Sequence, residues 1–484
     1  MSTNIKLILN MLGALLLILS GFMLVPAFIG WLYSENIAMV FLGSAIFTAI
    51  VGAILKFTTT KHSHNVSKQD TYIVVSSVWV VFTLFGMIPY FMGNGMSFID
   101  SLFESMSGFT TTGSSVIPRI DASPKSLILW RAMSQWIGGM GIITLSAVLF
   151  PALGIGGMQM FTAEASINKT DRVHPKINEV ARYAWGFYIL LTLIEIVLLR
   201  LGGMPVFEAV CHSFSTLSTG GFSPHAASIG FYGSAYIEYV VILFMFLGGM
   251  NFTLFYAMLF NKWNKVFSDD ELRIYILAII VCALSICIPL YISESGTTSG
   301  EYCFRRSLFH VVSVMTSTGF TTDNYSMWPA IATTITVLLM VTGTCTSSTS
   351  GGLKFMRIIV TVRYIKGEFR RMIHPTAIVP VKYNGKGLNS TDLRSVTLFL
   401  LFYFIVMIIG VILISFDGLS FEDAFGLGAN SLGDIGISVG SFGPNGNIYE
   451  LSTYTKSIMI ILMLLGRLEI FTVVILFVPS FWKK

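Results

Sequence analysis

Residues 98–115 read FIDSLFESMSGFTTTGSS, and three later stretches repeat their pattern. These are FEAVCHSFSTLSTGGFS (207–223), RSLFHVVSVMTSTGFTT (306–322) and FEDAFGLGANSLGDIGIS (421–438). In each stretch a charged residue stands thirteen positions before a glycine: Asp100 and Gly113, Glu208 and Gly221, Arg306 and Gly319, Asp423 and Gly436. The four glycines are separated by 108, 98 and 117 residues. Repetition at a nearly constant period indicates one structural unit built four times.

The composition around these stretches excludes a soluble protein. Of the 484 residues, 54% are hydrophobic and only 11% are charged, and the mean hydropathy is +0.76. Typical globular proteins contain about 25% charged residues. A chain of this length with so few charges cannot cover a water-exposed surface. Disorder, collagen and a disulfide scaffold are excluded as well, and the five cysteines are expected to be reduced.

Ten segments are apolar enough and long enough to cross a bilayer as helices. They are 7–34, 36–55, 71–99, 132–163, 181–201, 239–261, 274–293, 324–353, 395–416 and 453–480. The first has 28 uncharged residues and no Ala-x-Ala site, so we expect a retained helix rather than a signal peptide.

The four repeated stretches place about ten to twelve residues before their turns, too few to span a bilayer. They are also too apolar for loops, so we expect four re-entrant half-helices. The predicted fold is an all-α polytopic membrane protein in which four helix–pore-helix–filter–helix repeats follow an extra helix pair. The expected boundaries are 1–60 for the pair and 71–157, 178–262, 271–366 and 392–484 for the repeats.

Basic residues mark one side of the predicted membrane protein. They gather after residue 55, around 169–176, around 262–273 and at nine positions from Lys354 to Arg394. The positive-inside tendency therefore predicts that this last segment and both termini are cytoplasmic. A net charge of +5 is too small to indicate nucleic-acid binding.

Each repeated turn offers small residues and a glycine at membrane depth. Irregular backbone is tolerated there only where it lines a path or is covered by protein. Carbonyls aimed inward can replace the hydration shell of an alkali cation, and glycine permits the dihedrals that such turns need. A single turn of this kind would be an ordinary polar turn, but four copies at matched spacing favour a cation pathway. The predicted cation-binding residues are Thr111, Thr112, Gly113, Thr219, Gly220, Gly221, Ser317, Thr318, Gly319, Asp434, Ile435 and Gly436.

Two further features lie in the second helices of the later repeats. Residues 342–352 read TGTCTSSTSGG, eleven small or polar residues that should loosen the helix into irregular backbone. We predict a gate there, although a close helix-packing seam would give the same composition. Arg467 stands in the middle of the last apolar segment, where a charge usually faces a pathway or a partner. A salt bridge to Glu469 is the alternative, but residues two apart on a helix point to different faces. The predicted gate residues are Gly343, Thr344, Cys345, Thr346, Ser347, Ser348, Thr349, Ser350, Gly351 and Arg467.

These turns resemble the filters of the Trk/Ktr/HKT superfamily of potassium transporters, particularly its TrkH/TrkG type. So do SQWIGGMGI (134–142), LGIGGMQ (153–159), SFSTLSTGGFS (213–223) and LGRLEIFT (465–472). The resemblance implies a pseudo-fourfold, potassium-selective pore in the bacterial inner membrane, a homodimer, and a cytosolic TrkA-like nucleotide-binding regulatory subunit. In this superfamily a glycine in all four filters accompanies potassium selectivity, whereas serine in the first accompanies sodium permeation. An intramembrane loop and an arginine beneath the filter act as gates.

The sequence departs from the superfamily pattern at three positions. Asp434 stands where an uncharged residue is commoner, and it could either deepen a cation site or stiffen its turn. Thr344 and Ser347 stand where glycine is common, which implies a less mobile loop.

The expected function is potassium uptake without an enzymatic step or a bound cofactor. The sequence contains no H-E-x-x-H pattern and no GK[ST] phosphate loop, so nucleotide control would need a partner. A sodium-permeable member, or one that couples potassium to protons or sodium, is the alternative. Inverted-repeat transporters pair two halves, whereas this chain has four copies of the same sense.

Overall fold

The computed structural model describes residues 4–59, 67–144, 177–294, 298–444 and 446–482. Among these residues the regular structure is helical apart from one hairpin, formed by β1 (Lys382–Tyr383) and β2 (Lys386–Gly387). Helices dominate because they satisfy every backbone group within one segment. The motif at 153–159, the basic positions 61, 169, 172 and 176 and the end of the first predicted repeat lie outside the described residues.

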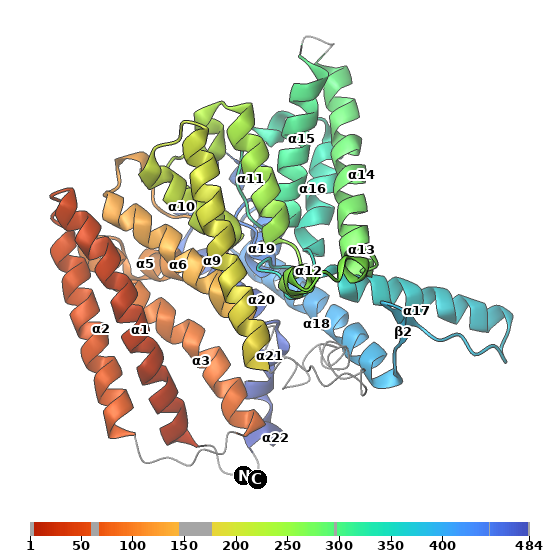
Figure 1. The fold of residues 1–484 in the computed structure, drawn as a ribbon, viewed down its shortest axis with the longest axis horizontal. Coiled ribbons are helices and arrows are strands. Elements are labelled where there is room, and N and C mark those ends of the chain that lie inside the picture. Colours follow the sequence, from red (N-terminus) through yellow and green to blue (C-terminus); the bar gives the residue numbers. More distant parts are fainter. Residues whose placement is uncertain (1–3, 60–66, 145–176, 295–297, 445, 483–484) are drawn as a thin grey trace.

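Helices α1 (Ile5–Leu32) and α2 (Ala38–Thr58) pack as an antiparallel pair beside α3 (Lys68–Gly86), at the left of Figure 1. Two glycines bring the backbones of the pair into contact. A Cβ on Gly13 would lie 2.7 Å from the carbonyl oxygen of Gly52, and one on Gly52 would lie 3.0 Å from that of Gly13. The first apolar segment is thus packed along the second rather than standing apart.

After this pair the chain places a long helix, a short helix and a second long segment in each of four successive stretches. The first has α3, α4 (Ile88–Gly93), α5 (Phe98–Phe109) and α6 (Lys125–Thr144); the second has α9 (Ile177–Leu201), α10 (Val206–Leu217), α11 (Ala235–Gly248) and α12 (Phe252–Leu259). The third has α13 (Trp263–Phe267), α14 (Asp270–Ser293), α15 (Gly300–Met315), α16 (Ala330–Thr342) and α17 (Phe355–Ile373). The fourth has α18 (Ser390–Ser415), α19 (Phe421–Gly433), α20 (Thr453–Arg467), α21 (Phe471–Val474) and α22 (Pro479–Trp482).

The short helices α5, α10, α15 and α19 contain 12, 12, 16 and 13 residues. The repeated charged residue has a structural cause in three of them. Asp100, Glu208 and Asp423 lie in the first turn, where a carboxylate complements the positive end of the helix dipole. Arg306 differs because α15 begins earlier, and it pairs with Glu294 (2.9 Å) and with Asp323.

The second long segment is broken in the last three stretches. Helices α11 and α12 meet at 92°, and the chain bends by 103° between α20 and the segment that begins with α21. Helices α16 and α17 are separated by non-helical residues 343–354, and α17 projects away from the bundle in Figure 1. The apolar segments at 239–261 and 453–480 are therefore bent, although both are expected as single spans.

Six described helices are long and apolar enough to cross a membrane: α1, α2, α3 with α4, α9 from Arg182, α14 and α18. The two bent pairs raise the total to eight if each is one span. The expected span at 324–353 does not meet the same criterion, since α16 has only 13 residues, and the expected span at 132–163 lies partly outside the described residues. The protein is thus a multi-pass membrane protein, and ten spans remain a prediction.

The two ends of the described chain meet at one end of the bundle (Figure 1). The backbone N–H of Asn4 donates to Asp70 at the start of α3 (2.8 Å). Gln69 donates from its side chain to the carbonyl oxygen of Phe481 in α22 (2.7 Å). The two ends of the described chain therefore lie close together, and the cytoplasmic location of the termini stays a prediction.

Candidate functional site

The four predicted turns have the same backbone conformation. In each, a residue with φ near 55° is followed two positions later by a glycine with positive φ. The first residues are Thr111, Thr219, Ser317 and Asp434 (φ 57°, 53°, 54° and 53°), and the glycines are Gly113, Gly221, Gly319 and Gly436 (φ 87°, 76°, 79° and 89°). A positive φ is a strained conformation for β-branched threonine. Four turns with the same strain, each after a short helix, indicate one repeated device.

The four turns meet in a closed ring. A Cβ added to Gly113 would collide with the carbonyl oxygen of Gly220, which belongs to the second turn. In the same way Gly221 faces Thr318 of the third turn, Gly319 faces Ile435 of the fourth, and Gly436 faces Thr112 of the first. Each glycine thus abuts the next turn, and the fourth returns to the first. All twelve predicted cation-binding residues lie in these turns.

Backbone carbonyls of this ring are left without partners. Each turn is closed on its own helix by an N–H···O=C bond, as from Thr112 to Ser107 (2.9 Å) and from Thr318 to Ser313 (2.9 Å). Among the described residues, no hydrogen-bond donor reaches the carbonyl oxygens of Thr112, Thr318 or Ile435. Buried carbonyls normally accept a hydrogen bond, so these oxygens are available to a ligand.

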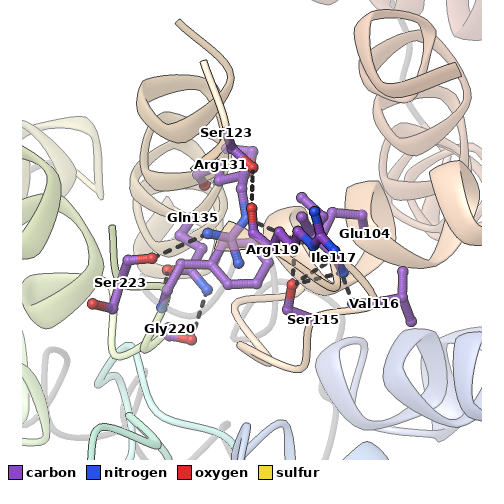
Figure 2. Close-up of polar contacts among 12 residues, drawn as sticks. Glu104, Ser115, Val116, Ile117, Arg119, Ser123, Arg131, Gln135, Gly220 and Ser223 are labelled. Atoms are coloured by element: carbon purple, nitrogen blue, oxygen red, sulfur yellow. Dashed lines mark hydrogen bonds and ion pairs between the residues drawn. The ribbon is translucent and has the colours of Figure 1, made fainter. Parts of the chain in front are cut away.

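The second turn is held from outside by Gln135 of α6. Its amide nitrogen donates to the carbonyl oxygen of Gly220 (2.6 Å), and its oxygen accepts from the backbone N–H of Phe222 (3.0 Å), as Figure 2 shows in part. Gln135 lies in SQWIGGMGI, but it was not among the predicted site residues. The sequence motif was the only indication of a role for Gln135, because its partner Gly220 lies 85 residues away in the chain.

A buried ion pair fastens the first turn to the second. Arg131 of α6 donates to Glu104 of α5 (2.7 Å) and to the carbonyl oxygen of Ser223 (3.1 Å) (Figure 2). Glu104 in turn accepts hydrogen bonds from the hydroxyl of Ser115 (3.0 Å) and the N–H of Val116 (2.9 Å). The pair therefore links the segments that follow the first and second turns, and removing one partner would leave the other charge buried and unpaired.

The fourth turn is braced by a side chain of α19. Asn430 accepts a hydrogen bond from the N–H of Gly436 (2.7 Å) and donates to the hydroxyl of Ser114 (3.0 Å). Asp434 accepts from the hydroxyl of Thr112 (2.8 Å). The contacts of Asn430 with Ser114 and of Asp434 with Thr112 connect the fourth turn to the first and support the closure of the ring.

The predicted gate segment is an irregular buried loop beneath the turns. Thr349 donates from its backbone N–H (3.3 Å) and its hydroxyl (3.0 Å) to the carbonyl oxygen of Gly248 at the break of α11. Thr219 of the second turn donates to the hydroxyl of Thr349 (3.2 Å), and the N–H of Gly351 donates to Ser317 of the third turn (2.7 Å). The loop therefore bonds to two of the four turns, and it also abuts the fourth, because a Cβ on Gly351 would collide with the carbonyl oxygen of Gly433.

Glu271 of α14 holds the ends of this loop, and it was missed from the sequence. Its carboxylate accepts hydrogen bonds from the N–H (3.1 Å) and hydroxyl (2.8 Å) of Thr346 and from the N–H of Met356 (2.7 Å). A buried carboxylate that accepts several hydrogen bonds is a strong anchor. Nothing in the local sequence links it to a loop 75 residues away.

Arg467 lies beneath the ring and bonds to the gate loop. Its guanidinium donates to the carbonyl oxygen of Thr349 (3.0 Å) and to that of Gly138 in α6 (3.0 Å). The expectation that it lies in the middle of a helix is wrong: α20 ends at Arg467, and Glu469 and Ile470 adopt positive φ. The alternative pairing with Glu469 is also absent, because Glu469 binds Arg357 (2.5 Å).

No metal site of protein side chains is found among the described residues, where no cluster of three histidine, cysteine or acidic side chains could hold an ion. The histidines on the short helices have other surroundings: His310 bonds to Thr336 (2.7 Å), and His212 is buried beside Tyr232 and Phe320. Beyond such clusters, the turns carry backbone carbonyls, threonine and serine hydroxyls and the carboxylate of Asp434.

The comparisons with known proteins agree on one family. The family model TrkH, described as a cation transport protein, matches residues 37–484. A Trk system potassium uptake protein TrkH of Salmonella typhimurium is 32% identical, covering 99% of this chain and 100% of the relative. The TrkG protein of Escherichia coli is 32% identical over 100% of both chains. The crystal structure of the potassium transporter TrkH from Vibrio parahaemolyticus matches with a TM-score of 0.90 and 32% identity, over 99% of this chain and 100% of the other.

Proposed function

Because the chain belongs to the TrkH family of cation transport proteins, we propose that it takes up potassium through the ring of four turns. The carrying observation is the closed ring, in which each glycine abuts a carbonyl oxygen of the next turn. Carbonyl oxygens at this spacing would replace the water that a permeating ion loses. The four short helices end at the ring, so their negative dipole ends would favour a cation there.

The proposed pathway has four predicted repeats, each with a re-entrant half-helix, and ten spans in all. We assign the selectivity filter to the twelve residues of the turns. Glycine at positions 113, 221, 319 and 436 supports potassium as the selected ion, on the pattern of the superfamily that these turns resemble.

The gate in this proposal is the loop 343–351 together with Arg467. Its support is the position of Arg467, whose bonds to Thr349 and Gly138 place a positive charge beneath the ring. A buried guanidinium opposes the passage of a cation. Conduction would then require the loop and the arginine to move together.

The setting of this function is also proposed rather than observed. We place the chain in a bacterial inner membrane with both termini in the cytoplasm, as a homodimer. The basic segment 354–394 would receive a cytosolic TrkA-like nucleotide-binding subunit. A negative-inside potential supplies about 2.3 kcal/mol per charge per 100 mV, which would draw potassium inward.

Growth of a strain that lacks potassium uptake, in limiting potassium, tests the proposal. The wild-type chain should restore growth, with and without its cytosolic partner compared in parallel. Absence of rescue by a chain that is present in the membrane would refute potassium uptake.

The alternative is a sodium-permeable or a proton- or sodium-coupled member of the superfamily. Competition between sodium and potassium during flux measurements would distinguish a sodium-permeable pore from a potassium-selective one. Gly113→Ser is the informative substitution. We expect this variant to admit sodium, because serine would disturb the φ of 87° and the contact with Gly220. Dependence of potassium flux on a proton or sodium gradient at fixed potential would favour coupling.

A further inference from the structure

Six charged side chains are buried together around the gate loop. Three are basic and three are acidic, and each interacts electrostatically or by contact with others of the set or with the loop. They are Glu271, Lys354, Arg357, Asp434, Arg467 and Glu469. Buried charges are retained only where a partner or several hydrogen bonds compensate the loss of water. The contacts that compensate each buried charge for its lost hydration therefore indicate the role of that residue.

Four of the six are accounted for by direct contacts. Arg357 pairs with Glu469 (2.5 Å). Glu271 accepts hydrogen bonds from the loop, as described above. Lys354 donates to the hydroxyls of Ser350 (3.1 Å) and Ser348 (3.3 Å). The contacts of Glu271 and Lys354 hold the gate loop, whereas the Arg357–Glu469 pair ties the start of α17 to the break after α20.

Asp434 and Arg467 are the remaining two. Both make hydrogen bonds, Asp434 with Thr112 and Arg467 with Thr349 and Gly138, but neither contacts an opposite charge, and each keeps an unused polar atom, as Arg357 does. Nε of Arg467 and Oδ2 of Asp434 are buried without a hydrogen-bond partner among the described groups. The unused Oδ2 lies 3.1 Å from where a Cβ on Gly466 would stand, next to Arg467 in the chain. The two opposite charges are therefore neighbours that make no ion contact in this conformation.

The backbone of the fourth turn does not require a carboxylate. Thr111, Thr219 and Ser317 hold the same positive φ at the equivalent place with a hydroxyl side chain. Only one oxygen of Asp434 is used to tie the turn, through Thr112. A purely structural role would be met by threonine or asparagine, so the charge itself needs an explanation.

We propose that Asp434 is the counter-charge of Arg467 and lowers the barrier that this arginine presents to a cation leaving the ring. Opposite charges in a water-poor interior interact over several ångströms, so contact is not required. The inference rests on the proposed pore and adds to it a residue that sets its conductance. The carboxylate of Asp434 thus acts through Arg467 and is a positioning group, whereas the backbone of Asp434 remains part of the proposed filter.

A double-mutant cycle on the purified full-length chain in proteoliposomes tests this. Rubidium influx under an inside-negative potential is measured for wild type, Asp434→Asn, Arg467→Ala and the double variant. Asparagine is suitable because it tolerates positive φ and keeps the acceptor for Thr112. We expect Asp434→Asn to lower influx about tenfold when Arg467 is present and less than about twofold when it is absent.

Glu450→Gln is the matched control, since it removes an exposed carboxylate from the same repeat away from the cluster. It should change influx equally little in both backgrounds. If Asp434→Asn does not yield folded protein, judged by size-exclusion chromatography, Asp434→Thr takes its place because threonine occupies the same backbone position in two other turns.

Equal effects of Asp434→Asn in the two backgrounds, or no loss of influx in wild type, would overturn the counter-charge role and leave the proposed pore intact. If Arg467→Ala does not raise influx while wild type still conducts, the counter-charge and the arginine barrier both fail. Failure of wild type to conduct rubidium or potassium at all refutes the proposed function itself, together with the inference that rests on it.

Discussion

In the proposed pore, single residues next to the ring would affect ion flow through their charge and through their hydrogen bonds. Arg467 is buried at the end of α20 and uses its two terminal nitrogens on carbonyls of different segments. Gln135 uses both ends of its amide on one turn. The first residue presents a barrier in the proposed pore, whereas the second preserves the shape of the ring. Substitutions at the two positions should therefore have different signatures.

Arg467→Ala should raise cation flux. The substitution removes a buried positive charge and the bond to Thr349 that holds the loop. We expect an increase of about tenfold in rubidium influx into proteoliposomes. Unchanged or reduced influx at normal expression would contradict the barrier role. Arg363→Ala, on the half-exposed side of α17, is the matched removal of an arginine outside the loop.

Gln135→Leu should weaken potassium selectivity and stability together. The change keeps the size of the side chain but leaves Gly220 and Phe222 without their partners. Two lost buried hydrogen bonds cost about 2–4 kcal/mol in the free energy of unfolding. Asn10→Leu loses one hydrogen bond, to Lys56 in the helix pair, and serves as the control. It should lower stability without altering the ratio of potassium to sodium flux, and a normal ratio for Gln135→Leu would argue against the bracing role.

At the scale of elements, the breaks in the second helices decide what lies beneath the ring. Helices α11, α16 and α20 end at Gly248, Thr342 and Arg467. The ends of α16 and α20 both lie against the fourth turn, where Gly433 approaches Met340 and Gly466 approaches Leu432. A Cβ on Gly248 would lie 3.1 Å from the side chain of Thr219. Continuous helices would instead carry their side chains past this point. The breaks therefore leave room for the non-helical residues 343–354, which include the loop 343–351 of the proposed gate.

Deletion of residues 345–350 should raise potassium flux if the loop blocks the pathway. The deletion removes the contacts of Thr349 with the second turn and with Arg467. We expect severalfold higher influx, measured as above, with the helices on both sides retained. Flux no higher than in the intact protein would remove the loop from the proposed gate. Glu271→Gln offers a milder test, because it weakens the anchor of the loop without shortening the chain.

The sequence predicted some of these elements and missed others for physical reasons. The turns were predictable because glycine recurs at a nearly fixed spacing, and the loop because TGTCTSSTSGG interrupts an apolar segment over eleven residues. The breaks after Gly248 and Arg467 were missed because one or two glycines in an apolar helix are usually tolerated. The roles of Gln135 and Glu271 depend on partners 75 or more residues away, which no local pattern reveals.

At the scale of the whole molecule, the long helices face outward and the short ones lie inside. Large apolar residues are exposed along α14 and α18, including Leu277, Ile280, Ile408 and Ile412. The short helices α5, α10 and α19 are buried for most of their length. This arrangement suits a molecule surrounded by lipid whose polar turns are covered by protein.

The predicted orientation can be tested by cysteine labelling from outside the cell. Met327→Cys, before α16, and Ile378→Cys, after α17, create thiols at strongly exposed positions on opposite sides of the predicted topology. A membrane-impermeant maleimide should label the first variant in intact cells and the second only after permeabilisation. The unmodified chain reports labelling of its five native cysteines. The reverse pattern would invert the orientation.

The ring of turns has a consequence for the order of the polypeptide. Since every turn contacts the next one and the last contacts the first, the ring of four turns has neither a first nor a last member. Near the two ends of the described chain, Asn4 and Phe481 bind the adjacent residues Asp70 and Gln69. A gene rearranged so that translation began with the second unit and finished with the first would preserve every neighbour around the axis. The order of the four units along the chain would then matter less to the proposed pore than the contacts between neighbouring turns.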